Sequence, residues 1–195
     1  MALKGLKTRE NRLELRRQLV HMTGGVLISI MAYLMKPLLG WLIVFPVLGG
    51  LAWFLSAPKL FPNLKDSNSI LFHFEREEDV RTLPYRGAIY FGFGMLIPLA
   101  LLPTEPACAA IIVLSVGDAL STIIGRLYGR VRIGGKSLEG FAAFVISSFI
   151  AALAYVDPKT AIVFAVIGGV VELIPHANDN ISIPAALTLA YKTLL

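Results

Sequence analysis

The chain has 195 residues, of which 56% are apolar and only 16% are charged, and its formal net charge is +5. Its mean hydropathy is +0.71. These values exclude a disordered chain and fit a soluble domain poorly, because about a quarter of the residues in soluble domains are charged. One cysteine, Cys108, excludes an internal disulfide. We expect residues 1–195 to form one integral membrane domain whose chemistry is built from helices and loops.

Long apolar runs predict an all-α, polytopic membrane protein with six or seven transmembrane helices. A span needs about 20 mainly apolar residues, and these runs lack the alternation of a membrane barrel. The six clearest runs are Leu19–Met35, Pro37–Leu55, Tyr85–Leu102, Pro106–Ile124, Glu139–Tyr155 and Lys159–Pro175. A seventh run, Ile181–Leu195, is short, so its crossing of the membrane stays open. Pro37 suits the first turn of the second helix.

Basic residues are concentrated in alternate polar segments. Residues 1–18, 56–86 and 125–138 together hold fifteen of the eighteen Lys and Arg residues. The positive-inside rule therefore predicts that these segments and the N-terminus face the cytoplasm. Residues 1–18 are typical of a basic interfacial helix. The 56–86 connection fits either a helix on the membrane surface or a lid over a site.

Several ionisable side chains fall within or beside the apolar runs, near the predicted cytoplasmic face. They are His21, Asp118, Glu139, Glu172 and Asp179. Such groups are costly in a bilayer and usually face a cavity or a charged partner. Any one of them alone fits an ion pair with a nearby arginine, but their convergence on one leaflet favours a functional site.

The connection after the fourth apolar run combines cations with glycine. Its cations are Arg126, Arg130, Arg132 and Lys136. Guanidinium and ammonium groups beside exposed backbone amides suit a polyphosphate. A role as topology determinant explains these charges, but not the glycines that precede Lys136-Ser137. The four-residue spacing of Gly117, Ser121 and Gly125 also fits close helix packing.

Asp118 precedes this cationic loop by about two helical turns. A carboxylate near a polyphosphate suits Mg²⁺, which prefers oxygen ligands and accompanies nucleotide triphosphates. We therefore predict Asp118 as a magnesium ligand, with Glu139 as a second. Asp179 comes from a different part of the chain and is our candidate for the general base, followed by Glu172 and His21.

The central segment resembles the signature of a known enzyme group. Gly117-Asp118, Gly125, Gly129 and Lys136-Ser137-x-Glu139-Gly140 are similar to the motif of dolichol kinases, phytol kinases and CTP-dependent diacylglycerol kinases. These polytopic lipid kinases are distantly related to phosphatidate cytidylyltransferases. Arg17-x-x-x-His21 resembles the opening motif of the group. Glu172 followed by Asp179-Asn180-x-x-x-Pro184 resembles its closing motif.

The resemblance implies a lipid kinase in the plasma membrane of a prokaryote, with its active site facing the cytoplasm. CTP would donate its γ-phosphate, with Mg²⁺, to the hydroxyl of an isoprenoid alcohol such as dolichol or another polyprenol, phytol or geranylgeraniol. The residues then assigned to nucleotide binding are Arg126, Gly129, Arg130, Arg132, Lys136, Ser137 and Asn180.

Other functions stay open at this point. A diacylglycerol-type kinase and a CDP-lipid-forming cytidylyltransferase share the motifs. A small membrane transporter would also bury carboxylates, although many transporters carry internal repeats that this sequence lacks. We expect membrane lipids and no nucleic acid as partners, and a homodimer stays open.

Overall fold

The computed structural model describes residues 9–62, 74–174 and 178–195. Predicted features in 1–8, 63–73 and 175–177 lie outside the described residues, including parts of the N-terminal segment and of the 56–86 connection. The helices are α2 (Arg9–Leu39), η1 (Gly40–Ile43), α3 (Val44–Leu60), α4 (Glu77–Thr82), α5 (Arg86–Leu101), α6 (Thr104–Ile112), η4 (Val113–Gly117), α7 (Asp118–Tyr128), α8 (Leu138–Ala152), α9 (Pro158–Leu173) and α10 (Asp179–Leu194). Over the described residues, each predicted apolar run is helical for most of its length, so the all-α class is confirmed.

The reversal between α2 and α3 differs from the prediction. Pro37 lies inside α2 and not in the first turn of the second helix, so that prediction is wrong. The chain reverses at Gly40, whose φ of 56° is the left-handed conformation that glycine adopts without steric cost. At the other end, α2 begins at Arg9, so the described part of the basic N-terminal segment is continuous with the first apolar helix.

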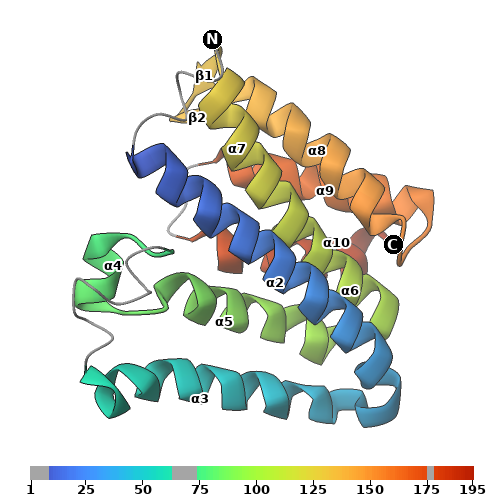
Figure 1. Cartoon of the computed structure of the whole chain (residues 1–195). Helices are drawn as coiled ribbons and strands as arrows, with labels where there is room; N and C mark the ends of the chain where they lie inside the picture. The colour runs from blue at the N-terminus through green and yellow to red at the C-terminus, as the bar shows by residue number, and fades with distance from the viewer. Residues whose placement is uncertain (1–8, 63–73, 175–177) are drawn as a thin grey trace.

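The continuous helical stretch α6–η4–α7 forms the centre of the bundle. It contacts α2, α5, α8, α9 and α10, while α3 lies at the edge against α5 (Figure 1). The largest fully buried side chains include Phe144 of α8 and Phe164 of α9. The core therefore lies around the helix that carries the central sequence motif.

Two stretches are long and apolar enough to cross a membrane, judged by length and composition over the described residues. They are Glu10–Leu60, which comprises α2, η1 and α3, and Thr104–Tyr128. The most apolar window is 11% buried in the first and 67% buried in the second, as expected for a peripheral and a central element. Helices α5, α8, α9 and α10 have 15 or 16 residues. Such helices are about 24 Å long, shorter than a hydrocarbon core of about 30 Å. Six or seven spans therefore stay a prediction.

Glycines allow the η4–α7 stretch to pack closely against α8. A Cβ atom at Gly117 would lie 2.8 Å from Cζ of Phe144. A Cβ atom at Gly140, on α8, would lie 2.8 Å from the carbonyl oxygen of Ser121. Both approaches are closer than side chains tolerate, so the small residues at these positions set the spacing of the two helices. The packing interpretation of the Gly117-Ser121-Gly125 face is confirmed.

A short hairpin connects α7 to α8. Strands β1 (Arg132–Ile133) and β2 (Lys136–Ser137) pair antiparallel, with Ile133 opposite Lys136. The turn residues Gly134 and Gly135 have φ values of 55° and 91°. A type I′ turn needs positive φ at both central residues, which explains the two glycines. Gly-Gly between two short polar segments is a known hairpin signal, so this turn was predictable from the sequence.

Candidate active site

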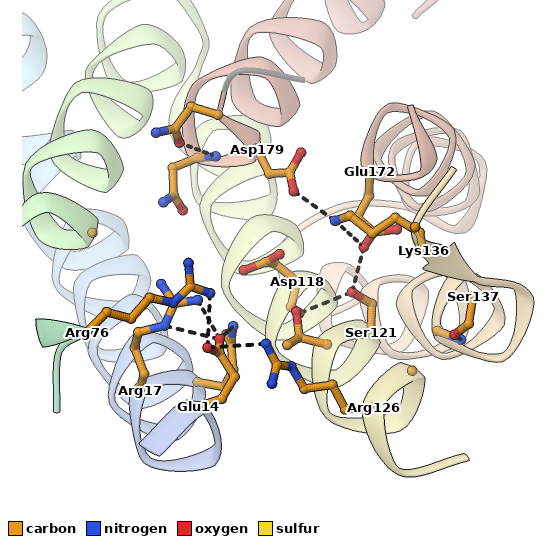
Figure 2. Close-up of a pocket in the computed structure, with 18 of the residues that line it drawn as sticks. Glu14, Arg17, Arg76, Asp118, Ser121, Arg126, Lys136, Ser137, Glu172 and Asp179 are labelled. Carbon is orange, nitrogen blue, oxygen red and sulfur yellow. Dashed lines mark hydrogen bonds and ion pairs between the residues drawn. The ribbon is translucent and has the colours of Figure 1, made fainter. Parts of the chain in front are cut away.

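A cavity of about 720 Å³ opens where one end of the bundle brings together segments distant in sequence. Its walls come from the start of α2, the region around α4 and α5, the exposed end of α7, the hairpin and the α9–α10 junction (Figure 2). The predicted site residues that line it are Asp118, Arg126, Arg132, Lys136, Ser137, Glu172, Asp179 and Asn180. The central and closing motifs therefore meet in one cavity.

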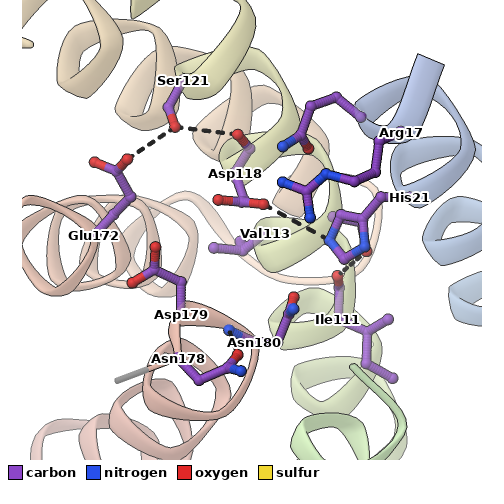
Figure 3. Close-up of polar contacts among 12 residues, drawn as sticks. Arg17, His21, Ile111, Val113, Asp118, Ser121, Glu172, Asn178, Asp179 and Asn180 are labelled. Carbon is purple, nitrogen blue, oxygen red and sulfur yellow. Dashed lines mark hydrogen bonds and ion pairs between the residues drawn. The ribbon is translucent and has the colours of Figure 1, made fainter. Parts of the chain in front are cut away.

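Asp118 is the first residue of α7 and directly follows the π-helical segment η4. Segments of this kind are frequent at functional sites. The Asp118 side chain is 16% exposed, and its Oδ2 lies 3.9 Å from Nε2 of His21, too far for a hydrogen bond (Figure 3). Within the described residues no hydrogen bond engages the Asp118 carboxylate, which leaves its oxygens available to a ligand in the cavity.

Lys136 is held between two carboxylates of the closing motif. Its Nζ donates to Oε1 of Glu172 at 2.7 Å and to Oδ2 of Asp179 at 3.0 Å (Figure 2). Burial lowers the pKa of Lys136, but the hydrogen bonds and negative charges of Glu172 and Asp179 outweigh it and leave the pKa raised. Lys136 therefore stays charged and ties the hairpin to α9 and α10.

Ser121 completes this group of interactions. Its Oγ donates to Oε1 of Glu172 at 3.1 Å and lies 3.1 Å from the backbone oxygen of Asp118. The Glu172 side chain is only 4% exposed, so these partners are needed to stabilise a buried carboxylate. Ser121 was assigned to packing by its spacing, and the structure adds a polar contact to that role.

Ser137 acts locally as a helix cap. Its Oγ accepts the backbone N–H of Gly140 at 3.0 Å, at the N-terminus of α8. This bond satisfies one of the amides that a helix start leaves unpaired. The residue also lines the cavity, so capping and a contact with a bound ligand both fit its position.

Four predicted site residues are not among those that line the cavity: His21, Gly129, Arg130 and Glu139. Oε1 of Glu139 accepts the backbone N–H of Arg130 at 3.0 Å. This hydrogen bond joins the start of α8 to the segment between α7 and β1. A Cβ atom at Gly129 would lie 2.8 Å from Oγ of Ser137, so this glycine permits close packing. His21 stays near Asp118 and packs edge-on against Phe91, with ring centroids 4.8 Å apart.

The helix α7 ends at Tyr128, so Arg126 and Arg130 do not continue along one helical face. Arg130 is exposed outside the cavity, whereas Arg126 reaches it. The four-cation cradle expected from the sequence is therefore divided: Arg126, Arg132 and Lys136 line the cavity, and Arg130 does not.

Sequence reasoning missed several polar residues of the cavity wall. They include Asn11, Gln18, Arg76, Asp79, Arg86, Tyr90, Thr122 and Asn178. Asn178 had a local signal, because its side chain caps α10 by accepting the N–H of Asn180 at 3.1 Å, as Asn commonly does. Arg76 had none, since its place depends on a contact with residues more than sixty positions away.

The oxygens of this cavity fit a magnesium-bound polyphosphate. Glu172 Oε2 and Asn180 Oδ1 are buried and lack a hydrogen-bond partner within the described residues. Carboxylate and amide oxygens are the ligands that Mg²⁺ takes, together with waters and substrate phosphates. The described part of the chain holds no group of three His, Cys, Asp or Glu residues placed to bind a metal by themselves. The fit therefore concerns an ion that arrives with its phosphates.

No family model and no solved structure matches the chain. The chain is 35% identical over 178 residues to the uncharacterized protein MJ1137 of Methanocaldococcus jannaschii, and the match covers 88% of each protein. This chain therefore belongs to the same family as that archaeal protein.

A second relative connects the chain to an enzyme. Over 119 residues it is 36% identical to the dolichol kinase of Saccharomyces cerevisiae. The match covers 54% of this chain and 22% of the yeast protein, so the chain corresponds to a limited part of that kinase. The similarity agrees with the dolichol-kinase-like group indicated by the sequence motifs.

Proposed function

We propose that this protein is a membrane lipid kinase that transfers the γ-phosphate of CTP to the hydroxyl of an isoprenoid alcohol. The observation that carries the proposal is the meeting of Asp118, Lys136, Glu172 and Asp179 in one polar cavity. The partial similarity to yeast dolichol kinase supports the same class of reaction. The apolar surface of α2 and α3 supports a position in the membrane, where a long-chain alcohol is dissolved.

The proposed reaction joins the alcohol oxygen to the γ-phosphorus and breaks the bond from that phosphorus to the β–γ bridging oxygen. CDP leaves, and the proton of the hydroxyl passes to a carboxylate of the enzyme. Phosphoryl transfer of this kind depends on positioning and on neutralisation of the phosphate charge. Cations at the cavity wall, including Arg126 and Arg132, serve that purpose.

Two carboxylates take different roles in the proposal. Asp118, whose carboxylate has no hydrogen-bond partner within the described residues, would hold Mg²⁺ together with oxygens such as Asn180 Oδ1. The ion would supply further neutralisation of the phosphate charge. Asp179 is the proposed general base, and Lys136 fixes its orientation through the 3.0 Å hydrogen bond. Glu172, bound to the same ammonium group, holds Lys136 in place.

The test uses purified protein in detergent, with a panel of isoprenoid alcohols and diacylglycerol as acceptors. CTP is labelled either at the γ-phosphate or at the α-phosphate, and ATP is run beside it. Lipid that acquires only the γ-label identifies a kinase. Lipid that acquires the α-label with cytidine, while pyrophosphate is released, identifies a cytidylyltransferase instead.

Two controls complete this experiment. The Asp118→Asn variant should form no labelled lipid, whereas Glu105→Gln, at the opposite end of the bundle, should be as active as the wild type. Absence of labelled lipid with every acceptor and nucleotide, together with solute flux in proteoliposomes, would favour a transporter and overturn the proposal.

A further inference from the structure

Three arginines from distant parts of the chain surround one buried carboxylate at the cavity wall. Oε1 of Glu14 accepts from Nε of Arg17 at 3.1 Å and also from its Nη2. Oε2 accepts from Nη2 of Arg76 at 3.1 Å and lies 3.6 Å from Nη2 of Arg126 (Figure 2). We call Arg17, Arg76 and Arg126 the arginine cluster. It joins α2, the segment before α4, and α7.

The exposures show which side of the cluster is open. The Glu14 side chain is 6% exposed, whereas those of Arg17, Arg76 and Arg126 are 32%, 53% and 41% exposed. All four residues line the cavity. A guanidinium has five N–H donors, so one edge can bind Glu14 while another faces a second anion. Within the described residues, Arg76 donates from Nη2 alone.

The charge of the cluster differs from that around Lys136. Among the ion pairs of the described residues, the single carboxylate of Glu14 pairs with all three guanidinium groups, so the cluster keeps an excess of positive charge. Lys136, by contrast, is bound by the two carboxylates of Glu172 and Asp179. Lys136, the cation next to the glycines of the central motif, is therefore already neutralised. The arginine cluster, which keeps excess positive charge, lies on the α2 side of the cavity.

The position of Arg76 is fixed by its own neighbours. Glu75 accepts the backbone N–H of Tyr85 at 2.8 Å, across the short helix α4. Tyr85 has a φ of 65°, a left-handed conformation that is strained for a residue other than glycine. A segment held in this way presents Arg76 to Glu14 across 62 positions of sequence.

We propose that the arginine cluster is a binding site for the phosphates of a nucleoside polyphosphate, and that Glu14 is the positioning residue that holds the three guanidinium groups in place. This inference rests on the proposed function, because it assigns the donor to one wall of that same cavity. Arginine suits the role, since its planar fork binds two phosphate oxygens at once. The polyphosphate is then held from the α2 side, with its transferred end toward Asp118 and Lys136.

The test measures binding of inorganic tripolyphosphate to the purified full-length protein by calorimetry, so that it does not depend on turnover. Arg76→Gln should weaken binding about tenfold or more, the size of one charge-assisted hydrogen bond. The matched control is Arg81→Gln, because Arg81 lies on the same segment and pairs with Glu77 outside the cavity wall. Equal binding by the wild type and Arg76→Gln would overturn the proposal.

Glu14→Gln separates positioning from simple charge. The substitution removes a negative charge, so tripolyphosphate should bind more tightly if Glu14 were only a counter-ion. We expect weaker binding, because the guanidinium groups lose the carboxylate that orients them. Tighter binding would overturn the positioning role. If this buried substitution prevents folding, Arg76→Lys tests the site instead: it keeps the charge but loses the fork, and should still weaken binding.

Two further measurements distinguish the sources of phosphate and the two proposals. In nanodiscs, anionic phosphatidic acid that competes with tripolyphosphate would assign the cluster to a lipid headgroup and overturn the nucleotide assignment. Tripolyphosphate binding that needs Arg76, without phosphorylation of any alcohol, would retain the site and reject the kinase. Phosphorylation of lipid with the same nucleotide KM in Arg76→Gln would retain the kinase and reject the site.

Discussion

The two ends of the helical bundle satisfy their polar side chains to different degrees. At the end opposite the cavity, Nζ of the buried Lys36 donates to the carbonyl of Leu102, and Asp157 accepts two backbone N–H groups at the start of α9. At the cavity end, several buried atoms lack partners within the described residues. They are Gln18 Oε1, His21 Nε2, Glu139 Oε2, Glu172 Oε2 and Asn180 Oδ1.

This difference separates what stabilises the fold from what serves a ligand. A buried polar atom without a partner costs about 1–3 kcal/mol, so such atoms reduce stability unless something binds them. Three of these residues, Gln18, Glu172 and Asn180, line the cavity, as expected if a charged ligand supplies the missing partners. At the opposite end, Lys36 and Asp157 bind backbone groups at the end of α5 and the start of α9. Substitutions at the cavity end should therefore reduce activity more than stability. Substitutions at the opposite end should reduce stability more than activity.

The largest expected effect is on the sidedness of chemical labelling, which should be all or none. Arg132 at the cavity end and Lys159 at the opposite end are both exposed. With a membrane-impermeant maleimide, Arg132→Cys should be labelled only from the cytoplasmic side and Lys159→Cys only from outside. Native Cys108 is buried and serves as the unlabelled background. Labelling of Arg132→Cys in intact cells would reverse the predicted orientation.

The next largest effect concerns the two aspartates of the cavity. Asp118→Asn should lose magnesium-dependent nucleotide binding and turnover together. Asp179→Asn should still bind the nucleotide with Mg²⁺, but its kcat should fall about a hundredfold or more, as expected when a general base is lost. Equilibrium binding and initial rates measure the two quantities separately.

The pair of variants also shows how the assignment can be wrong. If Asp118→Asn binds the nucleotide normally and Asp179→Asn does not, the two roles are exchanged. Full activity in both would show that the cavity is not the active site. Glu105→Gln, which changes an exposed carboxyl group at the other end, is the control for the loss of one negative charge.

A smaller effect is expected on stability in the central helix that connects the two ends. A Cβ atom at Gly117 would lie 2.8 Å from Phe144, and it would also approach Oγ of Ser148. Gly117→Ala should therefore destabilise the protein by about 1–3 kcal/mol, the usual range for overpacking. Gly49→Ala is the matched control, since nothing lies within 4 Å of its added Cβ. Thermal unfolding in detergent should separate the two variants, and equal Tm values would contradict the packing argument.

The helices were predictable because continuous apolar runs are a local signal. The ends of the helices were less predictable. Pro37 indicated a helix start, but the chain reverses three residues later, at the left-handed φ of Gly40. The spacing of Gly117 and Gly125 indicated packing correctly. The Gly134-Gly135 turn also had a local signal, which was interpreted as a phosphate-binding loop.

The cavity was only partly predictable for a physical reason. Asp118, Glu172 and Asp179 are conspicuous because charges are rare beside apolar runs. Arg76 is one of many cations in a polar connection, and only its 3.1 Å contact with Glu14 distinguishes it. Pairing of this kind depends on tertiary structure, which also explains why Lys136 was predicted as an open cation although two carboxylates bind it.

The smallest expected effect is at Asp157, which caps α9 far from the cavity. The hydrogen bonds from the hydroxyl and the backbone N–H of Thr160 lower the pKa of Asp157 below its ordinary value of 3.8. A carboxyl group with a lowered pKa stabilises the folded state above that ordinary value, and this contribution is lost as the pH falls through the lowered pKa. At pH 7, Tm should decrease slightly from wild type to Asp157→Asn and further to Asp157→Ala, because Asn keeps an acceptor and Ala does not. The difference between wild type and Asp157→Asn should shrink as the pH falls below about 4, and lipid phosphorylation at pH 7 should be the same in all three. A loss of turnover in Asp157→Asn would show that the two ends are coupled and that stability and ligand binding are not separated in this bundle.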